Sequence, residues 1–294
     1  MTSGRDRGSI YPYILLTSLI SQSPGRAGAT QGSVTTAAPP QPADAPDLKA
    51  MDKKHNRIVS RAILLAVAFT TLVSTCAASE GVILLHGLCR TERSMRTMAA
   101  ALEATGYSVV NVDYPSRRAT IEELAASSIA LALDHPKLVN LDKIHFVTHS
   151  MGGILVRQYL KTNKIDRLGR VVMLGPPNRG SEVVDALGDY KLFELINGPA
   201  GKQLGTGSDS VPNRLGPVHF DLGVIAGDLS INWINSWIIV GPDDGKVSVE
   251  RTKITGMTDH FVIHSVHPYL ASNPIAIQET IYFLRNGKFT QNDE

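Results

Sequence analysis

The 294-residue sequence has few cysteines and little excess charge of either sign. Its two cysteines, Cys76 and Cys89, are too few for a disulfide framework or a four-cysteine metal site. Lysine and arginine total 29 against 27 aspartates and glutamates, and this net charge of +2 is too small for a general polyanion-binding surface. We therefore expect no nucleic acid partner and no bound metal. The 43% of hydrophobic residues is enough for a buried core.

Residues 21–50 contain almost no large apolar side chains, because Ala, Pro, Gly, Ser, Thr and Gln dominate them. Such a composition buries too little apolar surface to offset the entropy of ordering, so we predict that this segment is disordered.

A secretory signal peptide is predicted over residues 51–79. Basic residues follow Met51, an uncharged run with an apolar centre extends over 62–79, and small residues occupy 76–79. This order of a basic region, a short apolar region and a small-residue cleavage site is typical of an export signal. We therefore predict an exported product, periplasmic or secreted. Residues 1–50 are then either a disordered extension or lie upstream of the true start at Met51.

Two other interpretations of the same segment are considered. A membrane-anchoring helix over 62–78 is disfavoured because a spanning helix needs about 20 predominantly apolar residues, and threonines and serines interrupt this short run. A lipoprotein cleavage site at Cys76 fits poorly, since Thr75 precedes the cysteine. Residues 80–294 hold 21 basic and 23 acidic residues and have the size of one domain, which is therefore close to neutral.

Beyond residue 80, short apolar runs alternate with helical patterns. The runs typical of strands buried in a parallel sheet are residues 81–86, 107–114, 144–148 and 169–174. A capping box of Thr120 and Glu123 begins one of the helices between them. Residues 223–228 and 236–240 compete as the next strand, and we favour the first. This alternation predicts an α/β fold with right-handed crossovers and a doubly wound, mostly parallel sheet.

A short strand over 261–263 and a final helix complete the predicted fold. Asn273 caps this helix, Pro274 occupies its first position, and Gly287 ends it. Binding sites in such a sheet lie beyond the carboxyl ends of the strands, so the chemistry is sought in the loops that follow them.

The segment His149-Ser150-Met151-Gly152-Gly153 joins a predicted strand directly to a predicted helix. A nucleophile elbow requires this context, because the tight turn lifts the serine hydroxyl above the sheet. The helix N-terminus carries about half a positive charge, and the Met151 N–H is a candidate oxyanion donor. Thr148 replaces the first glycine of the G-x-S-x-G pattern, so we expect a looser fit of helix against strand. We expect His149 to point to the other side of the turn.

The loop after the first strand is expected to supply a second oxyanion donor, the Leu88 N–H, because Gly87 allows the backbone to turn inward. His86 is assigned an orienting role. An acid and then a base should follow Ser150 in this architecture. The acid candidates are Asp243 and Asp244, although the turn that contains them is also consistent with two solvated carboxylates.

The candidate bases are His260, His264 and His267.

Together these motifs resemble the bacterial lipase and esterase branch of the α/β-hydrolase family. The resemblance runs from HGLCRTERSM through NVDYPSR, HFVTHSMGG, VVMLGPPNRGSEV and GPDDGKVSVE to HPYLASNP. It implies the α/β-hydrolase fold without the first two strands of larger members. It also implies that Asp244, directly before a glycine, is the acid, and that His267, 23 residues later, is the base. The implied enzyme is a serine hydrolase of carboxylic esters, lipid or acyl esters above all, that needs no cofactor.

The Gly-rich residues 180–222 are predicted to form a cap over Ser150, because they follow the strand that ends at Leu174. Leu192 and Phe193 are the candidate substrate contacts in this cap, and a satellite hydrophobic core is the alternative interpretation. The expected partner is a small-molecule or lipid ester, and membrane-surface contact through the cap is a further expectation. A thioesterase, amidase or acyltransferase would use the same residues, and a non-catalytic binding protein is the competing class.

Overall fold

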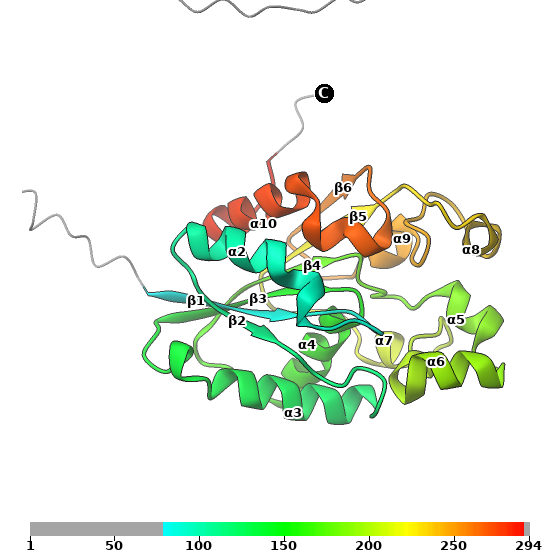
Figure 1. Cartoon of the computed structure of the whole chain (residues 1–294), viewed down its shortest axis with the longest axis horizontal. Helices are drawn as coiled ribbons and strands as arrows, with labels where there is room; N and C mark the ends of the chain where they lie inside the picture. The colour runs from blue at the N-terminus through cyan, green and yellow to red at the C-terminus, as the bar shows by residue number, and fades with distance from the viewer. Residues whose placement is uncertain (1–78, 291–294) are drawn as a thin grey trace, which may run out of the picture. The chain divides into compact units, whose positions relative to one another are not determined.

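The computed structural model describes residues 79–290, which contain a sheet of six strands between two layers of helices (Figure 1). The strands are β1 (Glu80–Leu85), β2 (Ser108–Val112), β3 (Lys143–His149), β4 (Leu168–Leu174), β5 (Leu222–Gly227) and β6 (Asp259–Ile263). Their spatial order is β2-β1-β3-β4-β5-β6, and all neighbouring pairs are parallel. The predicted doubly wound parallel sheet is confirmed, with its order reversing between β1 and β3.

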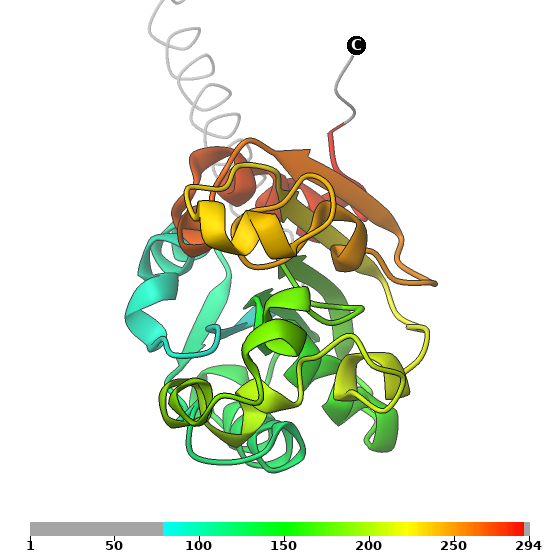
Figure 2. The ribbon, with the colours of Figure 1, turned by 90° about the vertical axis from the view of Figure 1, so that its right-hand side faces the viewer.

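Helices cover both faces of the sheet (Figures 1 and 2). The helices that pack on the central strands are α2 (Arg96–Ala104) and α10 (Pro274–Asn286) on one face, and α3 (Ile121–Leu133) and α4 (Met151–Thr162) on the other. Two single-turn 3-10 helices, η1 (Glu92–Met95) and η2 (Pro136–Leu138), precede α2 and β3. The strand carboxyl ends point toward the side that carries α5 (Glu182–Leu187), α6 (Lys191–Lys202), α7 (Val211–Arg214) and α8 (Trp233–Ile238).

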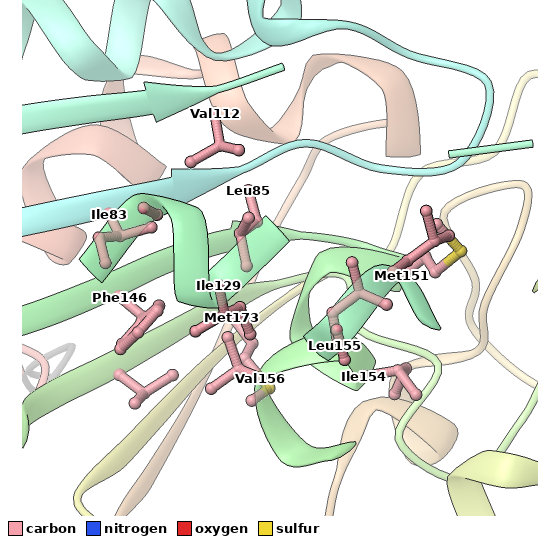
Figure 3. Close-up of a cluster of buried hydrophobic side chains, with 14 of the residues drawn as sticks. Ile83, Leu85, Val112, Ile129, Phe146, Met151, Ile154, Leu155, Val156 and Met173 are labelled. Carbon is pink, nitrogen blue, oxygen red and sulfur yellow. The ribbon is translucent and has the colours of Figure 1, made fainter. Parts of the chain in front are cut away.

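Alternation along the central strands produces two hydrophobic cores. On β1, Ile83 and Leu85 pack toward α3 and α4, while Val82 and Leu84 pack toward α2 and α10, and all four are fully buried. Figure 3 shows the first of these clusters, in which side chains of β1 and β3 meet those of α4. Burial on both faces explains why these strands are continuous apolar runs in the sequence.

The predicted helix boundaries follow from capping. Thr120 and Glu123 form the expected capping box at the start of α3, since each side chain accepts a hydrogen bond from the other residue's backbone N–H. Asn273 caps α10 by accepting from two backbone N–H groups, and Gly287 ends the helix in the left-handed conformation at φ 75°. Thr120, Glu123 and Asn273 thus accept hydrogen bonds from backbone N–H groups at helix starts, which have no carbonyl partner within the helix.

Of the two competing strand candidates, residues 222–227 form β5, as favoured. Most of the other candidate belongs to the short helix α8 (Trp233–Ile238), which Asn232 caps. Its apolar side chains are largely exposed, with Trp237 at 88% and Trp233 at 71% of their surface accessible. This apolar run therefore lies on the surface and not in the sheet, in agreement with the choice of the first candidate.

The predicted Gly-rich cap segment is more regular than expected, because three helices occupy it. These are α5 (Glu182–Leu187), α6 (Lys191–Lys202) and α7 (Val211–Arg214). Gly198 interrupts α6 with φ 68°, and a Cβ there would lie 2.0 Å from the carbonyl oxygen of Arg117. Only glycine fits this position, so the kink fixes α6 against the loop that follows β2.

The structure does not describe the segment with the predicted disorder, the signal peptide and Cys76, so these predictions lie outside residues 79–290. Within the described range, no helix combines the length and the apolar character needed to cross a membrane.

We predict that Gly223→Ala destabilises the fold. A Cβ at this position on β5 would lie 2.7 Å from ring atoms of both Phe283 and Phe289, so two buried rings would have to move. Overpacking of this kind typically costs about 1–3 kcal/mol, measurable as the free energy of unfolding in urea. Gly207→Ala is the matched control, because its Cβ would meet only the flexible Asp209 carboxylate. Equal unfolding free energies for the two variants would contradict the prediction.

Candidate active site

Ser150 occupies a strained turn between β3 and α4. Its φ of 55° and ψ of −124° are unusual for a residue other than glycine, and its N–H donates to the Leu174 carbonyl at 2.8 Å. Gly152 lets the first turn of α4 approach the end of β1, because a Cβ there would lie 2.6 Å from the Leu85 carbonyl oxygen. The predicted strand, tight turn and helix are therefore present.

The expected loose fit at Thr148 is wrong. Thr148 is fully buried, and Gly153 stands opposite it on α4. A Cβ on Gly153 would lie 3.3 Å from Thr148 Oγ1 and 2.8 Å from Met173 Sδ, so the absence of a side chain at Gly153 lets α4 pack closely against β3 and β4. Thr148 Oγ1 meets no hydrogen-bond partner among the described residues.

His267 and Asp244 form a buried pair. His267 begins the 3-10 helix η3 (His267–Ser272), and its Nδ1 lies 2.7 Å from Asp244 Oδ2. Asp244 Oδ1 accepts from the N–H groups of Lys246 at 3.0 Å and Val247 at 2.9 Å. The His267 N–H in turn donates to the Asp244 carbonyl at 2.8 Å. These bonds fix the carboxylate and favour the tautomer with the proton on Nδ1.

Two glycines make room for this pair, and the sequence analysis did not single them out. Gly175 follows β4 with φ 55°, and a Cβ there would lie 3.1 Å from both Asp244 Oδ2 and His267 Nδ1. A Cβ on Gly227, the last residue of β5, would lie 3.0 Å from Asp244 Cβ. A glycine directly at the end of each of two neighbouring strands was the available signal.

The other acid and base candidates lie elsewhere. Asp243 Oδ1 accepts from the Gly245 N–H at 2.7 Å and from the Ser236 hydroxyl at 3.1 Å, so it shapes the turn. His264 is exposed and pairs with Asp228, and His260 hydrogen-bonds Thr252.

Burial lowers the pKa of His260 to about 4. Of the candidates, only Asp244 and His267 contact each other.

A cavity of about 300 Å³ is lined by both Ser150 and His267. Gly87 lets the loop after β1 approach the serine closely, because a Cβ on Gly87 would lie 3.1 Å from Ser150 Cβ. Within residues 79–290, the N–H groups of Leu88 and Met151 meet no hydrogen-bond acceptor. An oxyanion donor must be free in this way to bind the oxyanion. No carboxylate lines this cavity among the described residues.

In the same range, no group of three or more histidines, cysteines or carboxylates is arranged to hold a metal.

His86 holds the loop that contains Gly87. It is fully buried, and its ring stacks on Tyr114 with centroids 4.1 Å apart and planes at 9°. The Tyr114 hydroxyl donates to the His86 carbonyl, and the Tyr114 N–H lies 3.3 Å from His86 Nε2. Burial lowers the pKa of His86, and its ring nitrogens are engaged away from the serine. This geometry is that of an orienting residue.

The expected position of His149 is wrong. Its ring lies beside that of His267, with centroids 4.8 Å apart, and its Nε2–H donates to the His267 carbonyl at 2.9 Å. Burial lowers the pKa of His149 well below its usual value, and the nearby His267 lowers it further. His149 is therefore neutral and positions the backbone of His267.

The two candidate substrate contacts have different environments. Phe193 lines the cavity, together with Val184 of α5 and Ile196 of α6. Leu192 exposes 66% of its surface and does not line the cavity. The two residues differ because consecutive helix residues point about 100° apart, and α6 turns Phe193 inward. A substrate contact by Leu192 stays a prediction.

Several solved structures share this fold. The lipase BlEst2 of Bacillus licheniformis in its mature form has a TM-score of 0.56 and 18% identity, over 71% of this chain and 93% of that one. The phospholipase PlaB of Legionella pneumophila has a TM-score of 0.57 and 19% identity, over 73% of this chain and 59% of that one. At such identities the similarity concerns the fold alone. A search of curated protein sequences finds no match.

A family model gives the assignment. The model described as the alpha/beta hydrolase family matches residues 82–235, which is just over half of the chain. The matched range runs from β1 through the Ser150 turn to α8, and the parallel sheet agrees with it. The chain therefore belongs to the alpha/beta hydrolase family.

Proposed function

We propose that the protein is a serine hydrolase that cleaves carboxylic esters through an acyl-enzyme. The nucleophile is Ser150, the general base is His267, and the acid that orients the base is Asp244. The observation that carries this proposal is the buried Asp244–His267 hydrogen bond at a cavity that the strained Ser150 turn also lines. Strained backbone at a non-glycine residue clusters at functional sites, because the surrounding structure must hold it there.

The proposed reaction begins when Ser150 Oγ attacks the ester carbonyl and His267 Nε2 takes its proton. Asp244 holds the imidazole by its Nδ1–H and stabilises the imidazolium that forms. The N–H groups of Leu88 and Met151 donate to the oxyanion of the tetrahedral intermediate. His267 then gives its proton to the leaving alcohol, and water hydrolyses the acyl-serine by the same steps.

Support for an acyl substrate comes from the lining of the cavity. Its cap side is mostly apolar: Val183, Val184, Phe193, Ile196 and Leu204 line it, beside the polar Ser181 and Asn197. Residues 180–222 thus act as the acyl-binding cap in this proposal. The lipase and phospholipase among the similar structures are named for lipid esters, and a lipid or other acyl ester fits the same apolar surface.

Labelling with a fluorophosphonate tests the nucleophile. The wild-type protein should form one covalent adduct, detected by mass spectrometry, and Ser150→Ala should abolish it. Ser181→Ala is the matched control, because Ser181 also lines the cavity but its hydroxyl donates to the Lys246 carbonyl and not to a histidine. An adduct that persists in Ser150→Ala would reject the proposed function.

The acid is tested by Asp244→Asn and Asp243→Asn. The asparagine oxygen would keep the bonds from Lys246 and Val247, which would turn the amide NH2 toward His267 and impose the wrong tautomer. We expect kcat on a neutral ester to fall by up to about 10,000-fold. Asp243→Asn keeps an oxygen that accepts the hydrogen bonds of the turn, so kcat of this variant should fall by less than about tenfold. A reversed order of the two variants would assign the acid to Asp243.

The cap is tested by the acyl-length profile of Phe193→Ala. Removing the ring enlarges the apolar cavity, so the kcat/KM ratio of a longer to a shorter ester should rise about tenfold or more. Leu192→Ala, on the outward side of α6, is the control and should keep the wild-type profile. An unchanged profile in Phe193→Ala with a lower melting temperature would assign this side chain to packing alone.

A further inference from the structure

Cations without carboxylate partners gather around the Ser150 cavity. Arg90, Arg117, Arg118 and Lys246 form no ion pair within residues 79–290. Many other cations of the same range are paired, for example Arg96 with Glu92 and Arg214 with Glu122. Residues 80–294 carry slightly more acidic than basic residues, so this positive region is a local feature.

Three of these cations line a second cavity of about 630 Å³, which we call the arginine cavity. It contains Arg90, Arg117 and Arg118, and one carboxylate of its lining, Asp113, faces His86 at 3.6 Å. Three cations against one anion leave it positively charged. Electrostatic complementarity at such a site favours an anionic ligand.

The arginine cavity adjoins the Ser150 cavity. Cys89, Arg90 and Ile196 line both. The apolar cap side of the Ser150 cavity lies on α5 and α6, whereas the arginine cavity lies toward the loop that follows β2. An ester held at Ser150 with its acyl chain against the cap therefore has a route for its alcohol portion into the arginine cavity.

The loop that bears the arginines is held in place. Arg117 donates from Nη1 to the Ile196 carbonyl at 3.4 Å, and the Arg117 carbonyl packs against Gly198 at the kink of α6. These contacts tie the loop to the cap helix that lines the Ser150 cavity. The field of the cations also reaches Cys89 at the boundary, since Arg117, Lys246 and Arg90 lower its pKa against the larger effect of burial, which raises it.

We propose that the arginine cavity binds a phosphate or carboxylate group in the alcohol portion of the substrate, so that the preferred substrates are acyl esters of anionic alcohols. This inference rests on the proposed ester hydrolysis at Ser150. Guanidinium groups suit the task, because their planar forks donate bidentate hydrogen bonds to phosphate and carboxylate oxygens. Asp113 then sets the orientation of the ligand by repelling it from the His86 side.

A matched pair of esters tests the inference. Monooctanoylglycerol and monooctanoylglycerol phosphate contain the same scissile ester and differ in one phosphate. Both are assayed as monomers at about 0.15 M salt, where charges beyond about 8 Å are screened. We expect the wild-type protein to prefer the phosphate ester in kcat/KM. In Arg117→Gln/Arg118→Gln, the ratio of the two kcat/KM values should fall at least about tenfold toward the neutral ester.

Two further variants control the comparison. Arg96→Gln removes an arginine of α2 that pairs with Glu92 and lines neither cavity, so the ratio should stay at its wild-type value. Arg117→Lys/Arg118→Lys keeps the charge but not the fork and should retain part of the preference. A wild-type protein without preference, or an equal ratio in the glutamine variant, would overturn the inference.

Calorimetry separates this inference from the proposed function. Glycerol phosphate and inorganic phosphate are titrated into Ser150→Ala and into the same chain with Arg117→Gln/Arg118→Gln. We expect glycerol phosphate to bind at least about tenfold more weakly to the second protein. If neither ester is hydrolysed yet this binding difference is found, the ester hydrolase proposal fails and the anion site stands. If both esters are hydrolysed without a preference and glycerol phosphate does not bind, the anion site fails alone.

Discussion

The hydrogen bond between Asp244 and His267 is the interaction on which the candidate site depends. A buried carboxylate is costly unless hydrogen bonds replace its water, and Asp244 receives three, two from its own turn and one from the imidazole. Space for it exists only because Gly175 directly follows β4 and Gly227 ends β5. The sheet, the turn and the 3-10 helix η3 thus meet at one carboxylate.

The Ser150 turn imposes the second constraint, because its backbone is strained. The strain is held by close approaches on both sides, with Gly87 against the serine and Gly152 against the end of β1. His149 connects this turn to His267, the proposed base, since its neutral ring donates to the His267 carbonyl. The two halves of the site are therefore joined by backbone contacts as well as by the cavity between them. A neutral buried histidine suits this role because it adds no charge next to the imidazole that accepts a proton in the proposed reaction.

The fold was largely predictable because its signals are local. Apolar runs, the Thr120 capping box and the Ser150 turn each depend on neighbouring residues. The proposed acid and base were harder to predict from the sequence. Two aspartates in the turn at 243–244 and three later histidines allowed several acid–base pairs, and only the family resemblance selected one of them.

Errors arose where tertiary packing decides the outcome. Thr148 fits closely because Gly153 of α4 faces it, and the residue pattern of the strand contains no information about that contact. Leu192 and Phe193 point in different directions because both lie on α6, and the sequence analysis did not predict this helix. The arginine cavity is a still longer-range feature, because the loops after β1 and β2 come together only in the folded sheet.

The position of α8 has an optical consequence. The chain contains two tryptophans, and both lie on this short exposed helix. Trp233 also lines a pocket with Asp244 and His267. The intrinsic emission of the protein is therefore a local probe of the rim beside the candidate site. A ligand that excludes water from Trp233 would shift the emission to shorter wavelength, even in a variant that cannot hydrolyse substrate. The two hydrophobic cores beside the sheet contain no tryptophan and would contribute no such signal.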